Sequence, residues 1–150
     1  MKQTSSEKHF LSLAGEYGVC SELAKREIRA SITYGNQKSA DIIITRDKKA
    51  YVVEVKTSKT KRIVTGFFQK YHTPETPHPD FWVIVHINPD TLSSDFYVLT
   101  HEEMAKEQMI RNNMTTWEHI NGVDNIMLSQ LEEYKNKWET IAIPCKEINF

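Results

Sequence analysis

The stretch that decides the fold covers residues 40–56 and reads ADIIITRDKKAYVVEVK. Both of its ends are rich in β-branched residues, a composition that favours strands. The polar residues 46–49 lie between the two apolar ends and leave room only for a tight connection. We therefore predict an antiparallel hairpin with Asp47 and Lys48 as its two-residue turn.

This hairpin would bring acidic and basic side chains together. In its register Ile43 faces Val52 and Asp41 faces Glu54, and directly opposed Cβ atoms lie about 5 Å apart on one face. Because side chains alternate along a strand, Lys56 lies on the same face as Glu54. Two opposed carboxylates repel each other unless a cation lies between them, and their hard oxygen atoms suit Mg²⁺ or Mn²⁺. We expect such a metal site to activate water towards a phosphate group, with Lys56 positioning or deprotonating that water.

The same residues also have a plainer interpretation. Glu-x-Lys is common by chance, and alternating charges often mark the solvent face of a strand. However, Asp41 begins an almost wholly apolar strand, and Glu54 lies between Val53 and Val55. Because a carboxylate in such a setting is costly without a partner, the sequence favours a functional site.

Basic residues follow the hairpin directly. The formal net charge is −1, yet residues 1–75 carry 14 Lys and Arg against 8 Asp and Glu, whereas residues 76–150 carry 5 against 12. Residues 55–74 contain no acid and hold the basic side chains Lys56, Lys59, Lys61, Arg62 and Lys70. Alone, this stretch is typical of a solvated loop; beside the acidic pair it predicts contacts with a polyanion such as nucleic acid.

The rest of the chain predicts one α/β domain over residues 1–150, since no repeat or long linker divides it. Thr100 is expected to cap a helix that starts with acidic residues in its first turn. The predicted order is a helix over 15–30, a strand over 31–34, a turn over 35–39, strands over 40–45 and 50–56, a loop with a short helix within 57–71, strands over 81–87 and 96–99, a helix from 101 and a helix over 128–138.

Composition disfavours several other classes of protein. The chain is 39% hydrophobic and 26% charged, and it has no apolar run near the roughly 18 residues of a membrane span. The absence of a secretory signal and of a pairing pattern for Cys20 and Cys145 predicts a cytoplasmic protein with reduced thiols. His72 and His78 have no third ligand nearby, which disfavours zinc. The C-terminal apolar residues, Trp138 among them, are expected in the core or in the seam of a homodimer.

One family resemblance rests on these residues. Asp41, followed thirteen residues later by Glu54-Val55-Lys56, resembles the signature of the PD-(D/E)XK nuclease superfamily, which includes many restriction enzymes and Holliday-junction resolvases. The resemblance implies a restriction-endonuclease-like core, with a central mixed sheet of about five strands flanked by helices. The likeness to small bacterial members covers roughly residues 12–105 and continues in residues 15–19, 22–26, 33–41, 79–83 and 95–98.

The resemblance implies a role for each matching residue. Asp41 and Glu54 would bind Mg²⁺, Val55 would offer its backbone carbonyl, and Lys56 would serve the attacking water. The activity implied is hydrolysis of DNA phosphodiester bonds, in restriction, repair or defence. A nucleic-acid-binding module that does not cut, or a nuclease subunit that needs a partner, is the alternative, because 150 residues leave little room for a separate sequence-reading domain.

An acid on the first helix often completes sites of this superfamily. Glu16 fits that place better than Glu22 does. The chain departs from the family pattern in two respects: Ala40 replaces the proline before the aspartate, and the Gln-x-x-x-Tyr motif of some members is missing. Gln69 and Lys70 are expected either at the site and the DNA phosphates or simply on the surface.

Overall fold

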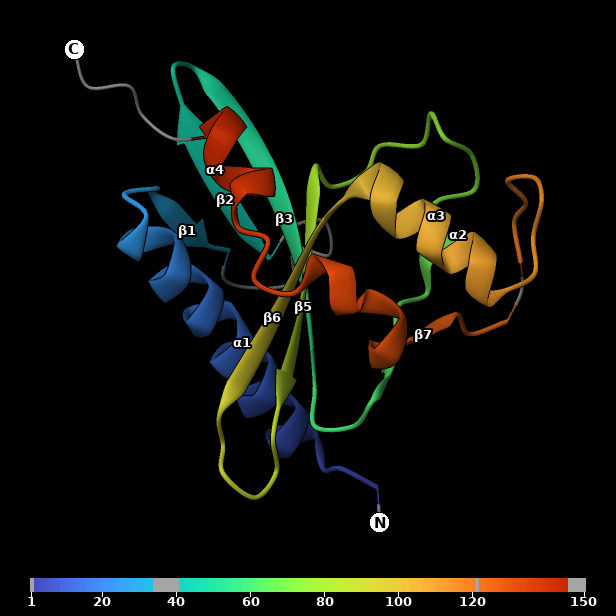
Figure 1. Ribbon diagram of the computed structural model, residues 1–150, viewed down its shortest axis with the longest axis horizontal. Coiled ribbons are helices and arrows are strands. Elements are labelled where there is room, and N and C mark those ends of the chain that lie inside the picture. The colour runs from blue at the N-terminus through green and yellow to red at the C-terminus, as the bar shows by residue number, and fades with distance from the viewer. Residues whose placement is uncertain (1, 34–40, 121, 146–150) are drawn as a thin grey trace.

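The computed structural model describes residues 2–33, 41–120 and 122–145, and the predicted turn over 35–39 lies outside these residues. Figure 1 shows the arrangement of the helices and strands along the chain. Their bounds are α1 Ser5–Lys25, β1 Ala30–Ile32, β2 Ile42–Arg46, β3 Lys49–Ser58, β4 Arg62–Val64, α2 Phe67–Lys70, β5 Phe81–Ile87, β6 Ser94–Thr100, α3 His101–Arg111, β7 Asn125–Met127, the 3₁₀ helix η1 Leu128–Tyr134 and α4 Glu139–Cys145.

The main sheet has five strands in the order β1-β2-β3-β5-β6. The pair β3 and β5 is parallel, and the other neighbours are antiparallel. The expected mixed sheet of about five strands with flanking helices is therefore confirmed. A second sheet pairs β4 with β7, which no pattern in the sequence predicted.

Two layers of helices cover the two faces of the main sheet (Figure 1). On one face α1 and α4 pack on the side chains of β5 that include Val83 and Val85. On the other face α2, α3 and η1 pack on the alternate side chains of β5, Trp82 and Ile84. Because both faces of β5 are buried, its sequence reads as a continuous apolar run.

The hairpin register agrees with the prediction. Ile43 pairs with Val52, and Arg46 pairs with Lys49 across the turn. Asp47 and Lys48 adopt φ values of 49° and 67°. Positive φ at both central residues is the condition for a type I′ turn, whose twist matches that of the flanking strands. The turn therefore fixes which residues of β2 and β3 face each other.

The predicted helix at the N-terminus is wrong at both ends, because α1 begins ten residues earlier and ends at Lys25. Thr4 starts it: the Thr4 hydroxyl accepts the Glu7 N–H, and the Glu7 carboxylate accepts the Thr4 N–H. This reciprocal capping box stabilises a first turn that has little apolar surface to bury. Residues 5–10 are all exposed, so no hydrophobic periodicity marks them.

The predicted final helix over 128–138 is also wrong. That segment forms η1, which ends at Tyr134, and α4 follows from Glu139. Trp138 lies between them, buried against the ring of Phe96 and beneath the Arg26 guanidinium. Trp138 therefore lies in the core, which is one of the two locations expected for it, and not in an exposed seam.

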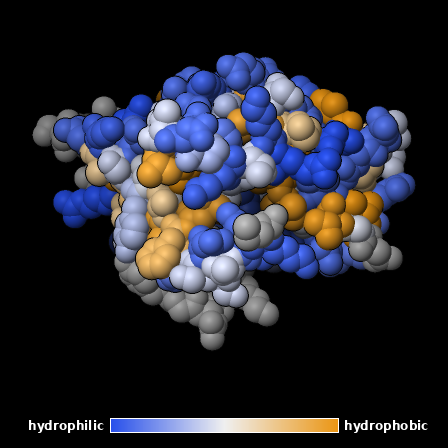
Figure 2. All heavy atoms as spheres, turned by 90° about the horizontal axis from the view of Figure 1, so that it is seen from below, coloured by the Kyte–Doolittle hydropathy of each residue, from blue (hydrophilic) through white to orange (hydrophobic). Residues whose placement is uncertain are grey.

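Hydrophilic side chains cover much of the face seen in Figure 2, and apolar residues form separate patches among them. The exposed large apolar side chains of the described residues include Phe10 and Leu92, each 66% exposed. None of the described helices has both the length and the apolar composition that crossing a membrane requires.

Candidate active site

The candidate site lies where β2 and β3 part. Pairing between them begins at Ile42, opposite Val53, whereas β3 continues to Ser58 with β5 along its other edge. Asp41 stands at this fork, just before β2. Its carboxylate oxygen Oδ2 accepts the Val55 N–H at 2.9 Å, and its backbone carbonyl accepts the Thr33 N–H at 3.1 Å. The aspartate is thus fixed between β1 and β3.

Glu54 is the buried acid of the site, with 7% of its surface exposed. Two ammonium groups approach the same carboxylate oxygen, Oε1. Lys56 Nζ lies 3.1 Å from it and Lys70 Nζ lies 3.8 Å from it. Lys56 comes from β3 itself, and Lys70 comes from the end of α2. The sequence leaves Lys70 either at the site and the DNA phosphates or on the surface; the structure brings it to the site, and its shared contact with Glu54 depends on the position of α2.

Burial and neighbouring charge raise the pKa of two acids of the site, Asp41 and Glu16. Burial raises the pKa of Asp41, and the nearby charge of Glu54 raises it further, against the lowering effects of the Val55 N–H and the two lysines. Burial together with the charges of Asp41 and Glu54 raises the pKa of Glu16 to about 7. Neighbouring carboxylate charge therefore disfavours the ionised forms of Asp41 and Glu16, and a cation close to them would favour those forms.

Gly15 allows α1 to approach the end of β3 closely. A Cβ atom at this position would overlap the side chain of Thr57, so any other residue would push the helix from the strand. Gly15 is buried. Because Glu16 is the next residue, this close packing is what brings its carboxyl within electrostatic reach of Asp41 and Glu54.

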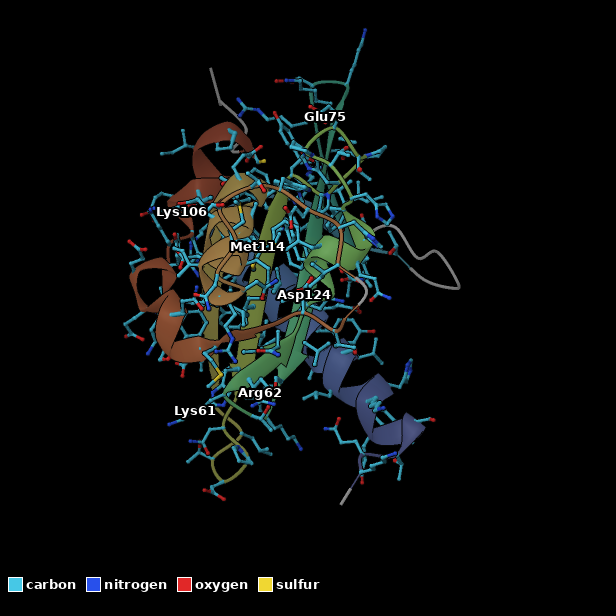
Figure 3. The ribbon with its side chains drawn as sticks, turned by 90° about the vertical axis from the view of Figure 1, so that its right-hand side faces the viewer. Lys61, Arg62, Glu75, Lys106, Met114 and Asp124 are labelled. Carbon is cyan, nitrogen blue, oxygen red and sulfur yellow. The ribbon has the colours of Figure 1, made fainter. Side chains whose placement is uncertain are left out.

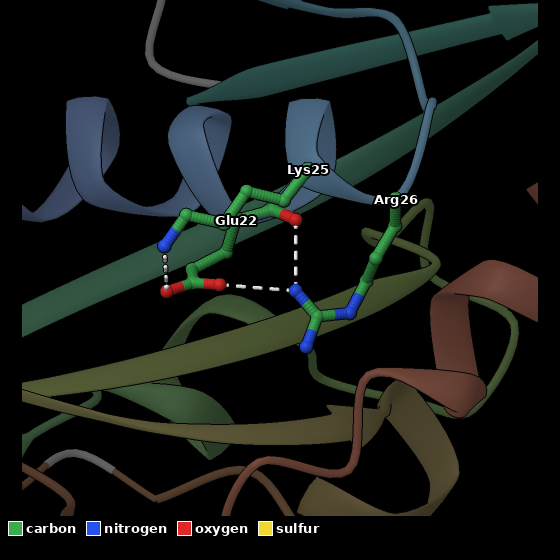
Figure 4. Close-up of polar contacts among 3 residues, drawn as sticks. All are labelled: Glu22, Lys25 and Arg26. Atoms are coloured by element: carbon green, nitrogen blue, oxygen red, sulfur yellow. Dashed lines mark hydrogen bonds and ion pairs between the residues drawn. The ribbon is translucent and has the colours of Figure 1, made fainter.

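Glu22 has different partners (Figure 4). Its carboxylate lies 3.2 Å from Lys25 Nζ and 3.0 Å from Arg26 Nη1, both on its own helix or directly after it. Burial raises the pKa of Glu22, but the hydrogen bonds from Arg26 and Lys25 outweigh that effect and lower the pKa. Glu22 therefore stabilises the C-terminal end of α1, whereas Glu16 responds to the acids at the fork.

The basic stretch is divided between two places. Lys56 and Lys70 reach Glu54, as described above. Lys59 and Lys61 are exposed on the connection from β3 to β4, and Arg62 is exposed at the start of β4. Figure 3 shows Lys61 and Arg62 at one end of the molecule, far from Glu75. Gln69 is also exposed.

Tyr71 lies on the side of the site opposite to α1. Burial raises the pKa of its phenol, and the charges of Glu54 and Asp41 raise it further. Its aromatic ring packs edge-on against Phe67 and Trp82. The phenol therefore stays protonated at neutral pH, and no motif in the sequence had singled it out.

Within residues 2–33, 41–120 and 122–145, no three His, Cys, Asp or Glu side chains are grouped closely enough to hold a metal ion by themselves. Mg²⁺, however, usually takes only one or two protein carboxylates and completes its shell with water and substrate oxygens. Four of the six histidines pair with one another elsewhere: the ring of His72 lies 4.3 Å from that of His119, and His78 stacks on His101 at 3.8 Å.

Comparison with known proteins shows the fold class. The sequence matches no protein-family model and no curated protein. Among solved structures the chain resembles a bacterial homing endonuclease, I-Ssp6803I, with a TM-score of 0.55 and 13% sequence identity. The match covers 96% of this chain and 95% of that one. The fold is therefore of a kind found in a nuclease.

We predict that Glu16→Gln changes stability in a pH-dependent way. The folded-state pKa of Glu16, about 7, exceeds its unfolded value of 4.5. Its contribution to stability is therefore present below pH 4.5 and is lost as pH rises through 7. Without divalent metal, the free energy of unfolding of Glu16→Gln should equal that of the wild type at pH 5. At pH 8 it should be larger by about 1 kcal/mol, allowing for solvent screening.

Urea unfolding in the presence of a chelator at both pH values measures this difference. Glu22→Gln is the matched control on the same helix. Because the pKa of Glu22 is lowered, its loss should instead destabilise the protein at pH 8. An equal effect of Glu16→Gln at pH 5 and pH 8 would contradict the assigned environment.

Proposed function

We propose that this chain is a divalent-metal-dependent nuclease of the PD-(D/E)XK kind that hydrolyses phosphodiester bonds in DNA. The observation that carries the proposal is the fork, where the Asp41 carboxylate accepts the Val55 N–H at 2.9 Å and the buried Glu54 carboxylate lies 3.1 Å from the Lys56 ammonium. The resemblance of the fold to that of a homing endonuclease supports the class of reaction. Fold alone does not assign activity, so the proposal rests on the side chains.

The donor set at the fork fits Mg²⁺ or Mn²⁺. Asp41 and Glu54 supply hard carboxylate oxygens, Val55 supplies a backbone carbonyl, and Glu16 is a further acid within electrostatic reach. Burial and mutual repulsion disfavour the charged forms of Asp41 and Glu16. A bound divalent metal would supply Lewis-acid stabilisation of phosphate charge and would lower the pKa of a coordinated water.

The lysines account for the remaining requirements of hydrolysis. An attacking water must lose a proton. Lys56 Nζ lies 3.1 Å from Glu54 Oε1, where its ammonium form would orient that water and only its neutral amine form would take the proton. Phosphate oxygens carry negative charge that increases during attack, and the Lys70 ammonium at the same carboxylate can compensate it. Lys59, Lys61, Arg62 and Gln69 would hold the flanking phosphates.

Cleavage assays test the proposal. Purified protein with Mg²⁺ or Mn²⁺ should cut at least one of four DNA forms: linear, nicked, single-stranded or branched. Asp41→Asn and Lys56→Ala should each lower the rate about 100-fold or more, because each removes a group acting at the reacting phosphate. Asp90→Asn and Lys106→Ala, which change exposed residues of like charge elsewhere, should keep the wild-type rate.

Cleavage that survives Asp41→Asn and Lys56→Ala unchanged would rule out this site. Salt-dependent DNA binding by a wild-type protein that shows no metal-dependent cleavage would favour the alternative, a nucleic-acid-binding module or a subunit that needs a partner.

The exposed basic residues make a separate prediction about DNA binding. Measured in a chelator, the slope of log K against log salt concentration should become less steep by about 0.9 for Lys61→Ala, because one phosphate contact is lost. The triple variant with Lys59, Lys61 and Arg62 all replaced by alanine should lose about three times as much. Lys106→Ala, on α3, is the charge-matched control (Figure 3). A slope unchanged in the triple variant would place the DNA elsewhere.

A further inference from the structure

Asp124 is a buried carboxylate far from the acids of the fork in sequence, with only 2% of its surface exposed. Its oxygen Oδ2 accepts the Phe68 N–H at 2.6 Å, and Oδ1 accepts Asn112 Nδ2 at 2.7 Å. Its backbone carbonyl accepts the N–H groups of Thr65 and Gly66 at 2.9 and 3.3 Å. One residue, which is labelled in Figure 3, therefore binds the whole turn that leads into α2.

The helix α2 needs such an external partner. It has four residues, begins after Gly66 at a φ of 60°, and has no side-chain cap of its own. A single helical turn is unstable alone, and its first N–H groups require acceptors from elsewhere. The carboxylate of Asp124 satisfies one of them, at the helix end where negative charge is favoured. Phe67 and Phe68 are fully buried and anchor the same turn.

The position of α2 determines where Lys70 lies. The last residue of this helix places its Nζ 3.8 Å from Glu54 Oε1, and its charge is coupled to that of Lys56. The buried phenylalanines hold α2 against the core, but apolar contacts are not directional. Hydrogen bonds to the Asp124 carboxylate are directional. They therefore fix both the rotation of α2 about its axis and its position along that axis, and so the place of Lys70 at its end.

We propose that Asp124 is a positioning residue of the active site, which holds the first turn of α2 so that Lys70 reaches Glu54. The role rests on the proposed nuclease function for its effect on catalysis. The arrangement of the residues themselves does not depend on that function. A buried carboxylate is costly to desolvate, and the hydrogen bonds to Phe68 and Asn112 offset that cost.

The test exchanges the two partners. Asp124→Asn keeps one acceptor for the Phe68 N–H but turns an amide NH₂ group towards that of Asn112. Asn112 could present its oxygen instead only by turning its own NH₂ group towards Gln108 Nε2, which donates to Asn112 Oδ1 at 3.4 Å, so the variant weakens the pair. The double variant Asp124→Asn/Asn112→Asp restores a donor opposite an acceptor. We expect Asp124→Asn to cleave roughly 10- to 100-fold more slowly, as a small misplacement of a catalytic group does, and the double variant to regain most of the rate.

Glu107 provides the matched control. It is a buried acid of α3, 5% exposed, that accepts hydrogen bonds from Tyr134 and Gln130 of η1. Glu107→Gln should lower the unfolding temperature comparably with Asp124→Asn yet keep the wild-type cleavage rate where both proteins are folded. Equal loss of rate in the two variants, or a wild-type rate in folded Asp124→Asn, would overturn the positioning role.

A second readout does not need cleavage. In the wild type, nuclear Overhauser contacts between the ε-methylene protons of Lys56 and Lys70 should report the approach of the two side chains. Asp124→Asn should lose these contacts, and the double variant should recover them. If they persist in Asp124→Asn, the inference fails whatever the activity. If wild-type protein cuts no DNA while the contacts behave as expected, the nuclease proposal fails and the positioning role stands.

Discussion

The hydrogen bond from the Val55 N–H to the Asp41 carboxylate, at 2.9 Å, is the contact on which the geometry of the site depends. Pairing of β2 with β3 begins only at Ile42, so the edge of β3 beyond that point has lost its neighbour. A backbone N–H at such a place needs an acceptor, and Asp41 provides one from its side chain. One acid is thereby fixed to the backbone of the strand that carries the other acid, Glu54.

The electrostatics of the site follow from this arrangement. Glu54 is buried and has two lysines at one oxygen. Asp41 and Glu16 instead have carboxyls whose charge is opposed by burial and by their neighbours. The charged forms of Asp41 and Glu16 are therefore disfavoured at the fork, an imbalance that a bound divalent cation would remove. This imbalance, together with a fold found in a homing endonuclease, is the basis for proposing phosphodiester chemistry here.

Local patterns in the sequence predicted the strands and the register of the hairpin from Ile42 to Val53, because a two-residue turn and a side-chain period of two leave no freedom there. These patterns did not predict elements whose position depends on exposed residues or on residues far away in the sequence. The start of α1, residues 5–10, depends on the cap at Thr4 and not on an apolar face. The pairing of β4 with β7 joins segments far apart in the chain. The position of Lys70 depends on Asp124, whose carboxylate accepts a hydrogen bond from the N–H of Phe68, 56 residues earlier in the chain.

The central claim is that the acids at the fork bind a divalent metal, and metal binding tests it without any assumption about substrate. Titration with Mn²⁺, followed by electron paramagnetic resonance, should show binding to the wild type that Asp41→Asn abolishes. Glu22→Gln, whose carboxylate is paired with Lys25 and Arg26, should bind as the wild type does. Absence of Mn²⁺ binding by the wild type, or binding that Asp41→Asn leaves unchanged, would contradict the account.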